Sequence, residues 1–330
     1  MIFAPIFRGL NRVLELDSFN PLLPPEFPND NGSTGCVGRR DQVPCYVVDA
    51  NINPPLQTWR LTLAYDGTDF QGWQIQPGQP TIQGELQAAL GRITGETPLP
   101  QGSGRTDAGV HALAQVASFQ LRAPIPAENL LRALNRTLPP SIRISEASTV
   151  RSTTFHARHS AIAKTYEYRI IRGSGGSPFL ARYVYCCPWA LDLAALQAAA
   201  RAFIGEHDFQ SFAATDPDFA QRSSDPPTGS IESRGKTIRT IYSSFWEERT
   251  SEAGDLLVYR VRGNGFLHHM VRNLVGTMLD AGRGQLSPDQ IPAILAARSR
   301  SAAGPTAPAR GLFLVSVDYP PEDCGSGVAV

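Results

Sequence analysis

Alternation between apolar and polar residues predicts strands in both halves of the chain. Residues 60–65 (RLTLAY) and 164–171 (KTYEYRII) follow the period of two that is typical of a strand. After residue 65 the pattern stops, and Gly67 and Gly72 indicate a loop. Further strands are predicted over residues 115–121, 141–145, 237–248, 256–264 and 311–319.

A helical period of about 3.6 residues separates several of these strands. In residues 81–94 the apolar positions fall on one helical face, and Thr81 is placed to cap the first turn. Further helices are predicted over residues 126–138, 191–205, 265–282 and 287–299.

The predicted order of strands and helices is mixed, which indicates an α+β fold. We expect two similar α/β halves, residues 59–160 and 161–320, with mixed, largely antiparallel sheets covered by helices, and a tail at 321–330. Residues 1–58 are rich in Pro, Asn and Gly at their centre and hold no period, so we expect a poorly ordered N-terminal extension. The polar, Pro-rich stretch 214–236 is predicted to be a surface insertion.

Charge is unevenly distributed along a chain of zero formal net charge. Residues 103–172 hold ten Arg or Lys and four acids, a net charge of plus six, whereas residues 1–58 carry a net charge of minus two. Nucleic-acid binding depends on local basic surface rather than on the sum over the chain. The central stretch is therefore compatible with an RNA or DNA partner.

Several classes of protein are disfavoured by composition. No apolar run reaches the roughly eighteen residues that a membrane span requires. The N-terminal residues lack the ordered regions of a secretory signal, so we expect a cytoplasmic location. The five cysteines are odd in number and contain no C-x-x-C pair, which fits neither a disulfide framework nor a zinc site.

The most suggestive chemistry lies in a glycine-rich segment, residues 102–112 (GSGRTDAGVHA). Asp107 is its single acid, with Arg105 before it and His111 after it, and no other acid occurs within ten residues on either side. Asp and Gly are common turn formers, so the segment by itself also fits an ordinary turn.

Two adjacent histidines, His268 and His269, fall on the predicted helix 265–282. Adjacent helical side chains point about 100° apart, which makes a poor pair of metal ligands. No metal site is expected there, and Arg272 is expected on the same side of the helix as both histidines.

Seven segments, taken in chain order, resemble the motifs of the tRNA pseudouridine synthase A family. Together they span roughly residues 59–320, and the N-terminal extension and the insertion are the only departures. The segments are AYDGTDFQGWQIQP, TIQGELQAAL, SGRTDAGVHA, FHARHSAIAKTYEYRI, GEHDFQSFA, GNGFLHHMVRNLVG and GPTAPARGLFLVSVDY.

The resemblance implies a pseudouridine synthase fold with a catalytic cleft between the two halves. It implies conversion of uridine to pseudouridine at positions 38 to 40 of the tRNA anticodon stem-loop, without a cofactor and by a homodimer. By the same resemblance, Asp107 is the nucleophile, Arg272 its ion-pair partner, and Arg105 the residue that assists base flipping or grips a phosphate.

Tyr166 matches the family's base-contacting tyrosine, although Tyr168 shares its strand face and periodicity alone does not choose between them. We also expect His111, His268 and His269 to line the substrate pocket, with a packing role equally compatible for His111.

Two other functions fit parts of the sequence. A non-catalytic RNA-binding module or RNA chaperone could use the same scaffold. A glycoside or nucleoside hydrolase would need a second carboxylate close to Asp107 in space.

Overall fold

The computed structural model describes residues 54–152, 154–173, 176–214, 237–251, 254–323 and 328–329. All of them belong to one compact unit, Ile52–Val330. The predicted disorder of residues 1–58 and the predicted insertion at 214–236 fall almost entirely outside the described residues. The first strand begins at Gln57, so the regular fold starts two residues earlier than expected.

Eleven strands form one mixed sheet in the described part of the chain, in the order β11-β4-β1-β3-β10-β5-β9-β8-β7, with β2 paired to β3 and β6 to β5. Every strand expected from the sequence is present, and the short strands β2, β6, β7 and β11 are additional. The strands are β1 (Gln57–Tyr65), β2 (Gln101–Gly102), β3 (His111–Leu121), β4 (Ile142–Val150), β5 (Ala163–Arg172), β6 (Tyr185–Cys187), β7 (Gly205–Asp208), β8 (Ile238–Ser251), β9 (Gly254–Gly263), β10 (Leu312–Asp318) and β11 (Val328–Ala329).

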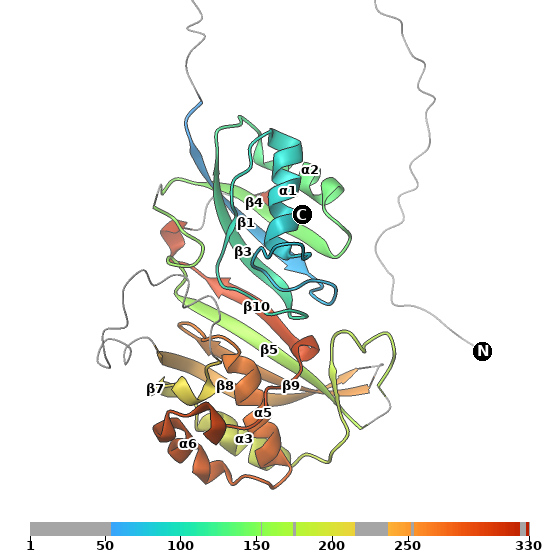
Figure 1. The fold of residues 1–330 in the computed structure, drawn as a ribbon, viewed down its shortest axis with the longest axis vertical. Helices are drawn as coiled ribbons and strands as arrows, with labels where there is room; N and C mark the ends of the chain where they lie inside the picture. Colours follow the sequence, from blue (N-terminus) through green and yellow to red (C-terminus); the bar gives the residue numbers. More distant parts are fainter. Residues whose placement is uncertain are drawn as a thin grey trace, which may run out of the picture. The chain divides into compact units, whose positions relative to one another are not determined.

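Strand β10 joins the two halves of the sheet. It pairs in parallel with β3 from the N-terminal half and antiparallel with β5 from the C-terminal half. Figure 1 shows β10 and β5 side by side between the two halves. A single sheet therefore replaces the separate sheets that the sequence suggested, and it fixes the two halves against one another.

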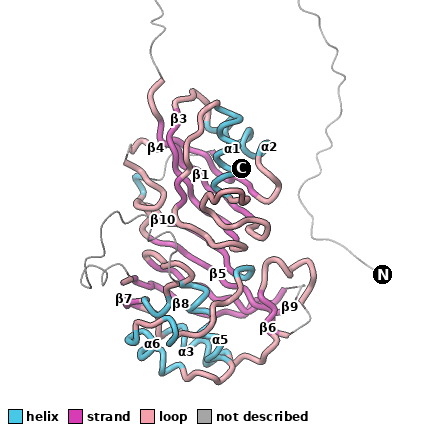
Figure 2. The backbone as a smooth tube through the Cα atoms, in the orientation of Figure 1, coloured by secondary structure: helices cyan, strands magenta, loops and turns pink. Residues whose placement is uncertain are grey.

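The helices form two groups, one in each half, with β10 and β5 between them (Figure 2). In the N-terminal half α2 packs against β4 and α1 against α2, and in the C-terminal half α3 packs against β8 and α5. The α+β prediction is confirmed. Within the described residues the helices are α1 (Ile82–Thr94), α2 (Ala127–Thr137), α3 (Leu193–Arg201), α5 (Met270–Gly282) and α6 (Ile291–Ala297), with 3-10 turns at Gln210–Phe212, Pro288–Gln290, Arg300–Ala302, Ala309–Gly311 and Pro321–Asp323.

One hydrophobic cluster extends through both halves. It includes Leu61 of β1, Tyr168 of β5 and Met278 of α5, each with no exposed surface. Thr81 caps α1 as predicted, because its hydroxyl accepts a hydrogen bond from the Gly84 N–H at 3.3 Å. None of the described helices has the length and apolar character needed to cross a membrane.

The helix expected from residue 265 begins only at Met270. His269 has a left-handed backbone, with φ at 58°, and this geometry cannot continue a right-handed helix. The prediction that His268 and His269 lie on the helix is therefore wrong, and both belong to the turn that precedes it.

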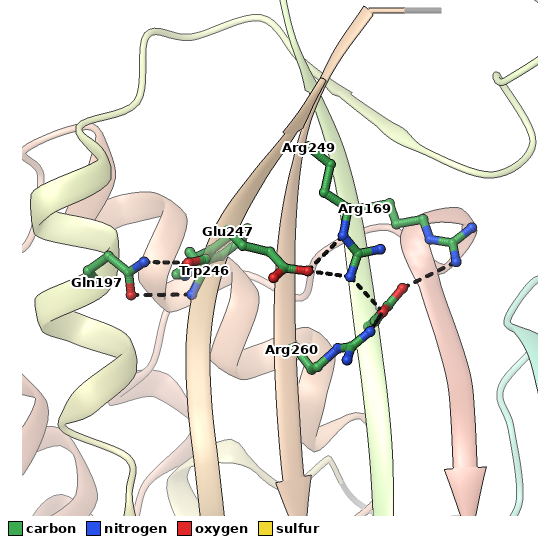
Figure 3. A network of polar contacts seen from close by, with 7 residues as sticks. Arg169, Gln197, Trp246, Glu247, Arg249 and Arg260 are labelled. Carbon is green, nitrogen blue, oxygen red and sulfur yellow. Dashed lines mark hydrogen bonds and ion pairs between the residues drawn. The ribbon is translucent and has the colours of Figure 1, made fainter. Parts of the chain in front are cut away.

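A buried carboxylate holds three arginines on the sheet. Glu167 of β5 is 2% exposed and pairs with Arg169 on the same strand, Arg249 of β8 and Arg260 of β9. Figure 3 shows these arginines, with Glu247 bonded to Arg249, on the side of the strands away from the α3 residue Gln197. The network connects three neighbouring strands of the C-terminal half through one charge.

Replacing Glu167 by Gln should lower stability by about 1 to 2 kcal/mol at pH 7, because the arginines lose a charged partner but keep access to solvent. Burial alone would raise the pKa of Glu167, but bonds from Arg260 and Arg249 outweigh it and lower the pKa. The stability that the ionised Glu167 carboxylate gives the folded protein is therefore fully present above the unfolded-state pKa of about 4.3. It is lost as pH falls through the lower folded-state pKa.

Urea unfolding of the wild type and Glu167→Gln between pH 7 and pH 3 tests this expectation. The stability difference should stay constant down to about pH 5 and shrink below about pH 4. Glu248→Gln is the matched control, because Glu248 is 47% exposed and pairs only at the surface with Arg172. If the stability difference between the wild type and Glu167→Gln were the same at every pH, the ionised Glu167 carboxylate would not be its source.

Candidate active site

The loop that carries Asp107 runs from the end of β2 to the start of β3. Hydrogen bonds from buried polar groups hold it in place. The Ser103 N–H donates to the Val116 carbonyl at 2.7 Å. The Gln115 amide accepts from the Ser103 hydroxyl at 2.6 Å and donates to the Gly104 carbonyl at 2.9 Å. The Tyr65 hydroxyl lies 2.9 Å from that of Thr106, the residue before Asp107. These bonds hold the loop in one conformation.

The neighbouring loop approaches this segment so closely that two glycines are required. Gly72 has φ at +85°, and a Cβ there would lie 2.5 Å from the Thr106 carbonyl oxygen. A Cβ at Gly102 would lie 2.5 Å from the Trp73 ring. Protein therefore occupies the space beside these glycines, so they serve close packing around the loop.

Gly72→Ala should destabilise the protein and reduce turnover, since relief of the clash must move Thr106 and with it Asp107. Gly78→Ala is the matched control, because Gly78 has φ at +68° but open space around it. Gly78→Ala should lower the free energy of unfolding by about 1 kcal/mol, because of its backbone conformation alone. Gly72→Ala should cost about 1 to 3 kcal/mol more in urea unfolding. Equal losses for the two variants would contradict this role of Gly72.

Asp107 forms an ion pair with an arginine from the other half of the fold. The Arg272 Nη1 lies 2.9 Å from the Asp107 Oδ2, and the two side chains are 15% and 16% exposed. The Arg272 Nε donates to the Ala307 carbonyl at 2.8 Å, which fixes the plane of the guanidinium. Arg272 is the third residue of α5 and so lies in the first turn of the helix. The sequence-predicted pair is thus brought together across 165 residues.

Both histidines of the turn before α5 face the same carboxylate. His268 Nε2 lies 3.6 Å from Asp107 Oδ1 and His269 Nε2 lies 3.4 Å from Oδ2. Their rings lie in contact, tilted by 33° with centroids 4.0 Å apart. Burial lowers the pKa of His269 against the opposing pull of Asp107, which favours a neutral ring at pH 7.

Asp107, His268 and His269 are spaced so that one ligand atom from each could meet a metal ion. The guanidinium of Arg272 already occupies the carboxylate at 2.9 Å and would repel a cation at that position. These residues are therefore better described as a carboxylate held by one guanidinium and two imidazoles than as a metal centre.

A cavity of about 920 Å³ opens beside Asp107 and is lined by both halves of the fold. Tyr166 forms part of its wall, 7% exposed, with its ring edge-on to Phe266 at 5.0 Å. Burial, and then Tyr65 and Asp107, raise the pKa of Tyr166 well above its usual value, so its hydroxyl stays protonated. Arg105, His268 and His269 line the same cavity.

The structure separates Tyr166 from Tyr168, which periodicity left equivalent. Tyr168 does not line the cavity, and its hydroxyl donates to the Pro308 carbonyl at 2.8 Å. Tyr166 alone of the two is available to a bound molecule.

His111 lies outside the cavity and is 1% exposed. Its Nδ1 accepts from the Gly67 N–H at 3.2 Å, its Nε2 lies 2.9 Å from the Arg182 carbonyl, and its ring stacks on Phe313 at 4.7 Å. Burial lowers its pKa. The expected substrate contact does not agree with this position, and the packing role does.

Sequence reasoning missed three side chains of the cavity. Lys164 and Arg158 add positive charge to the wall, and Phe266 adds an aromatic face. The signal for the lysine was available, because Lys164 is one of only two lysines in the chain and stands two residues before Tyr166.

An α+β protein whose basic, aromatic-walled cavity contains one partly buried, ion-paired carboxylate has the features of an enzyme that acts on an anionic, ring-containing substrate through a single acid. Among the described residues that line this cavity, Asp107 carries the only carboxylate.

Comparison with known proteins agrees with this class. A family model described as tRNA pseudouridine synthase matches residues 62–160 and 199–320. A tRNA pseudouridine synthase A from Solibacter usitatus is 52% identical over 262 residues, covering 79% of this chain and 98% of the relative. The proteins of the same name from Moorella thermoacetica and Bacillus pumilus are 45% and 41% identical over the same shares of chain and relative. The chain belongs to the tRNA pseudouridine synthase family, which confirms the resemblance of its motifs.

Proposed function

We propose that the protein converts uridine to pseudouridine at positions 38 to 40 of the tRNA anticodon stem-loop, with Asp107 as the nucleophile. The observation that carries the proposal is the single carboxylate, held by Arg272 at the wall of a basic cavity. Family membership and the names of the relatives support tRNA as the substrate.

The reaction is an isomerisation whose atoms balance without a cofactor. The bond between ribose C1′ and uracil N1 breaks, the base rotates, C1′ joins C5, and the hydrogen of C5 leaves as a proton while N1 gains one. One carboxylate is sufficient for this sequence, because it can bond covalently to the intermediate and leave again. Hydrolysis would instead require a second carboxylate to activate water.

The neighbouring side chains have distinct parts in this proposal. Tyr166 and Phe266 together form an aromatic wall against which the uracil ring packs while it is detached from the ribose C1′. Arg105 enters the space that the flipped nucleotide leaves, or grips the adjoining phosphate. His268 and His269 keep water from the carboxylate and orient it through their Nε2 atoms.

Release of tritium from tRNA labelled at uracil C5 tests the proposal. Transcripts should each carry one labelled uridine, at position 38, 39 or 40, with a label elsewhere as control. Release from these positions without free uracil is the expected result. Free uracil among the products would indicate a hydrolase, and tight binding without release would indicate an RNA-binding module.

We also propose a homodimer in the cytoplasm, with tRNA lying across a cleft shared by both subunits. The motifs that resemble the family motivate this assembly. Light scattering of the full chain at the concentrations used for turnover should give twice the mass of 35.8 kDa. A monomer that remains fully active would remove this part of the proposal.

A further inference from the structure

The segment 303–308, whose Ala307 carbonyl bonds to the Arg272 guanidinium, forms neither helix nor strand. A regular ladder of backbone bonds therefore does not fix the position of this carbonyl. The Ala307 N–H also donates to the Arg272 carbonyl at 3.1 Å. The segment lies tightly on α5, because a Cβ added at Gly276 would lie 1.6 Å from the Pro305 carbonyl oxygen. Whatever holds this segment in place also holds the guanidinium.

Asn273, the residue after Arg272 on α5, bonds to this segment through its side chain. Asn273 has no exposed surface, and its Oδ1 accepts from the Thr306 hydroxyl at 2.7 Å and from Arg300 Nη2 at 3.0 Å. The same Nη2 donates to Thr306 Oγ1 at 3.1 Å, so the three polar groups close a triangle of hydrogen bonds. We refer to Asn273, Arg300 and Thr306 as the polar triangle.

The polar triangle is extended along the segment by Arg300 and by a hydroxyl of α5. Arg300 Nη1 donates to the Gly304 carbonyl at 2.9 Å, and the Thr277 hydroxyl accepts from the Gly304 N–H at 2.9 Å. A Cβ added at Gly304 would lie 2.8 Å from the Thr277 Cα, so helix and segment are also in close contact there. Side-chain bonds thus take the place of a ladder over the residues that lead to Ala307.

The other end of the Asn273 amide holds a second neighbour of the active-site carboxylate. Its Nδ2 donates to the Phe212 carbonyl at 2.7 Å. Two residues later in the chain, the Ala214 N–H donates to the His268 carbonyl at 3.0 Å. Asn273 therefore connects the segment that orients Arg272 with the turn that holds His268, and both of these side chains face the carboxylate.

The chemistry of the polar triangle suits the accurate placement of one carbonyl oxygen. None of its three residues, all within the described part of the chain, lines the cavity beside Asp107. Apolar contacts are non-directional, whereas hydrogen bonds fix orientation as well as distance. An active-site group must be held within about 0.5 Å of its productive position, which directional bonds achieve better than apolar packing.

We propose that the polar triangle positions the active site for isomerisation: it sets the Ala307 carbonyl, which aligns the Arg272 guanidinium with Asp107. Its residues are positioning residues, which act through the groups that face the carboxylate. The inference rests on the proposed function for the reaction that it serves. Because a small displacement of an active-site group reduces rate steeply, a defect in the polar triangle should lower kcat in protein that still folds and binds tRNA.

Thr306→Val removes the hydroxyl from the polar triangle and keeps the branched shape of the side chain. We expect kcat for tritium release to fall by about 10-fold to 100-fold, the scale of loss that a small displacement causes. KM should change little, because the polar triangle lies outside the cavity wall. Thr306→Ser keeps the hydroxyl and should recover most of the rate. Thr137→Val is the matched control, since the Thr137 hydroxyl bonds to the Ala133 carbonyl within α2.

Hydrogen exchange of the Arg272 Nε–H measures the hold on the guanidinium without turnover. In protein with ¹⁵N-labelled arginine, the signal of this group is identified by its loss in Arg272→Lys. Its exchange should be about fivefold to tenfold faster in Thr306→Val, the factor expected when one hydrogen bond is lost, and unchanged in Thr306→Ser. If Thr306→Val does not fold, Arg300→Gln gives the same test at a half-buried side chain. Wild-type exchange in a folded variant would overturn the inference.

Coupling to Arg272 distinguishes positioning from a general effect on stability. The double variant Thr306→Val/Arg272→Gln should be no slower than Arg272→Gln alone, because residues that act through one another are not additive. A full further loss in that background would overturn the inference.

The outcome for the polar triangle is separate from that for the proposed function. Normal kcat and normal exchange in folded Thr306→Val would overturn the positioning role and leave the isomerase intact. Faster exchange in Thr306→Val, in a protein whose wild type releases no tritium, would support the hold on Arg272 and overturn the isomerase.

Discussion

Asp107→Asn should abolish tritium release while leaving tRNA binding within about twofold. The amide keeps the size of the carboxylate and one hydrogen bond to Arg272, but it cannot form a covalent adduct or carry negative charge. Loss of a nucleophile removes most of the catalytic advantage of an active site, so turnover should fall by about 10,000-fold or more.

Single-turnover release with enzyme in excess measures this loss without interference from product release. Asp107→Ala should be equally inactive, which excludes slow deamidation of Asn as the source of residual rate. Asp69→Asn is the control, because Asp69 is 68% exposed and pairs at the surface with Arg182. Release by Asp107→Asn at a rate near that of the wild type would show that Asp107 is not the nucleophile.

The fold was largely predictable because its elements have clear periods. Strands such as β1 alternate buried and partly exposed residues, and α1 carries its own cap and apolar face. The joining of two sheets into one was not predictable, because β10 pairs with β3 through only two residues that lie about 200 positions away in the chain. Local pattern contains no information on such distant partners.

Site residues that match a family motif could be predicted from the sequence. Predictions failed for residues whose position depends on local backbone geometry. The pairing of Asp107 with Arg272 followed from the family motifs, and the structure has it at 2.9 Å. The positions of His268 and His269 depend on one left-handed residue that no helical pattern reveals. The contribution of Lys164 depends on burial and on the cations around it, which are separated in sequence but adjacent in space.

Arg272→Gln should lower kcat by about 100-fold to 1,000-fold, in the range seen when one charge-stabilising donor is removed from an active site. Arg272 is the guanidinium bonded to Asp107, and its second bond to the Ala307 carbonyl fixes its orientation. Arg272→Lys should recover only part of the rate, because an ammonium cannot donate to both acceptors in one plane. KM should change little, since the residue contacts the carboxylate rather than lining the cavity.

A double-mutant cycle distinguishes this role from a purely structural one. If Arg272 acts through Asp107, the double variant Asp107→Asn/Arg272→Gln should be no slower than Asp107→Asn alone, because residues that act as a unit are not additive. Thermal unfolding of Arg272→Gln measures what the lost bond to Ala307 costs the fold. A rate loss that vanishes once the folded fraction is accounted for would show that Arg272 only stabilises the junction of the two halves. A loss that persists in fully folded protein, and disappears in the Asp107→Asn background, would make Arg272 the group that holds the nucleophile in its aligned position.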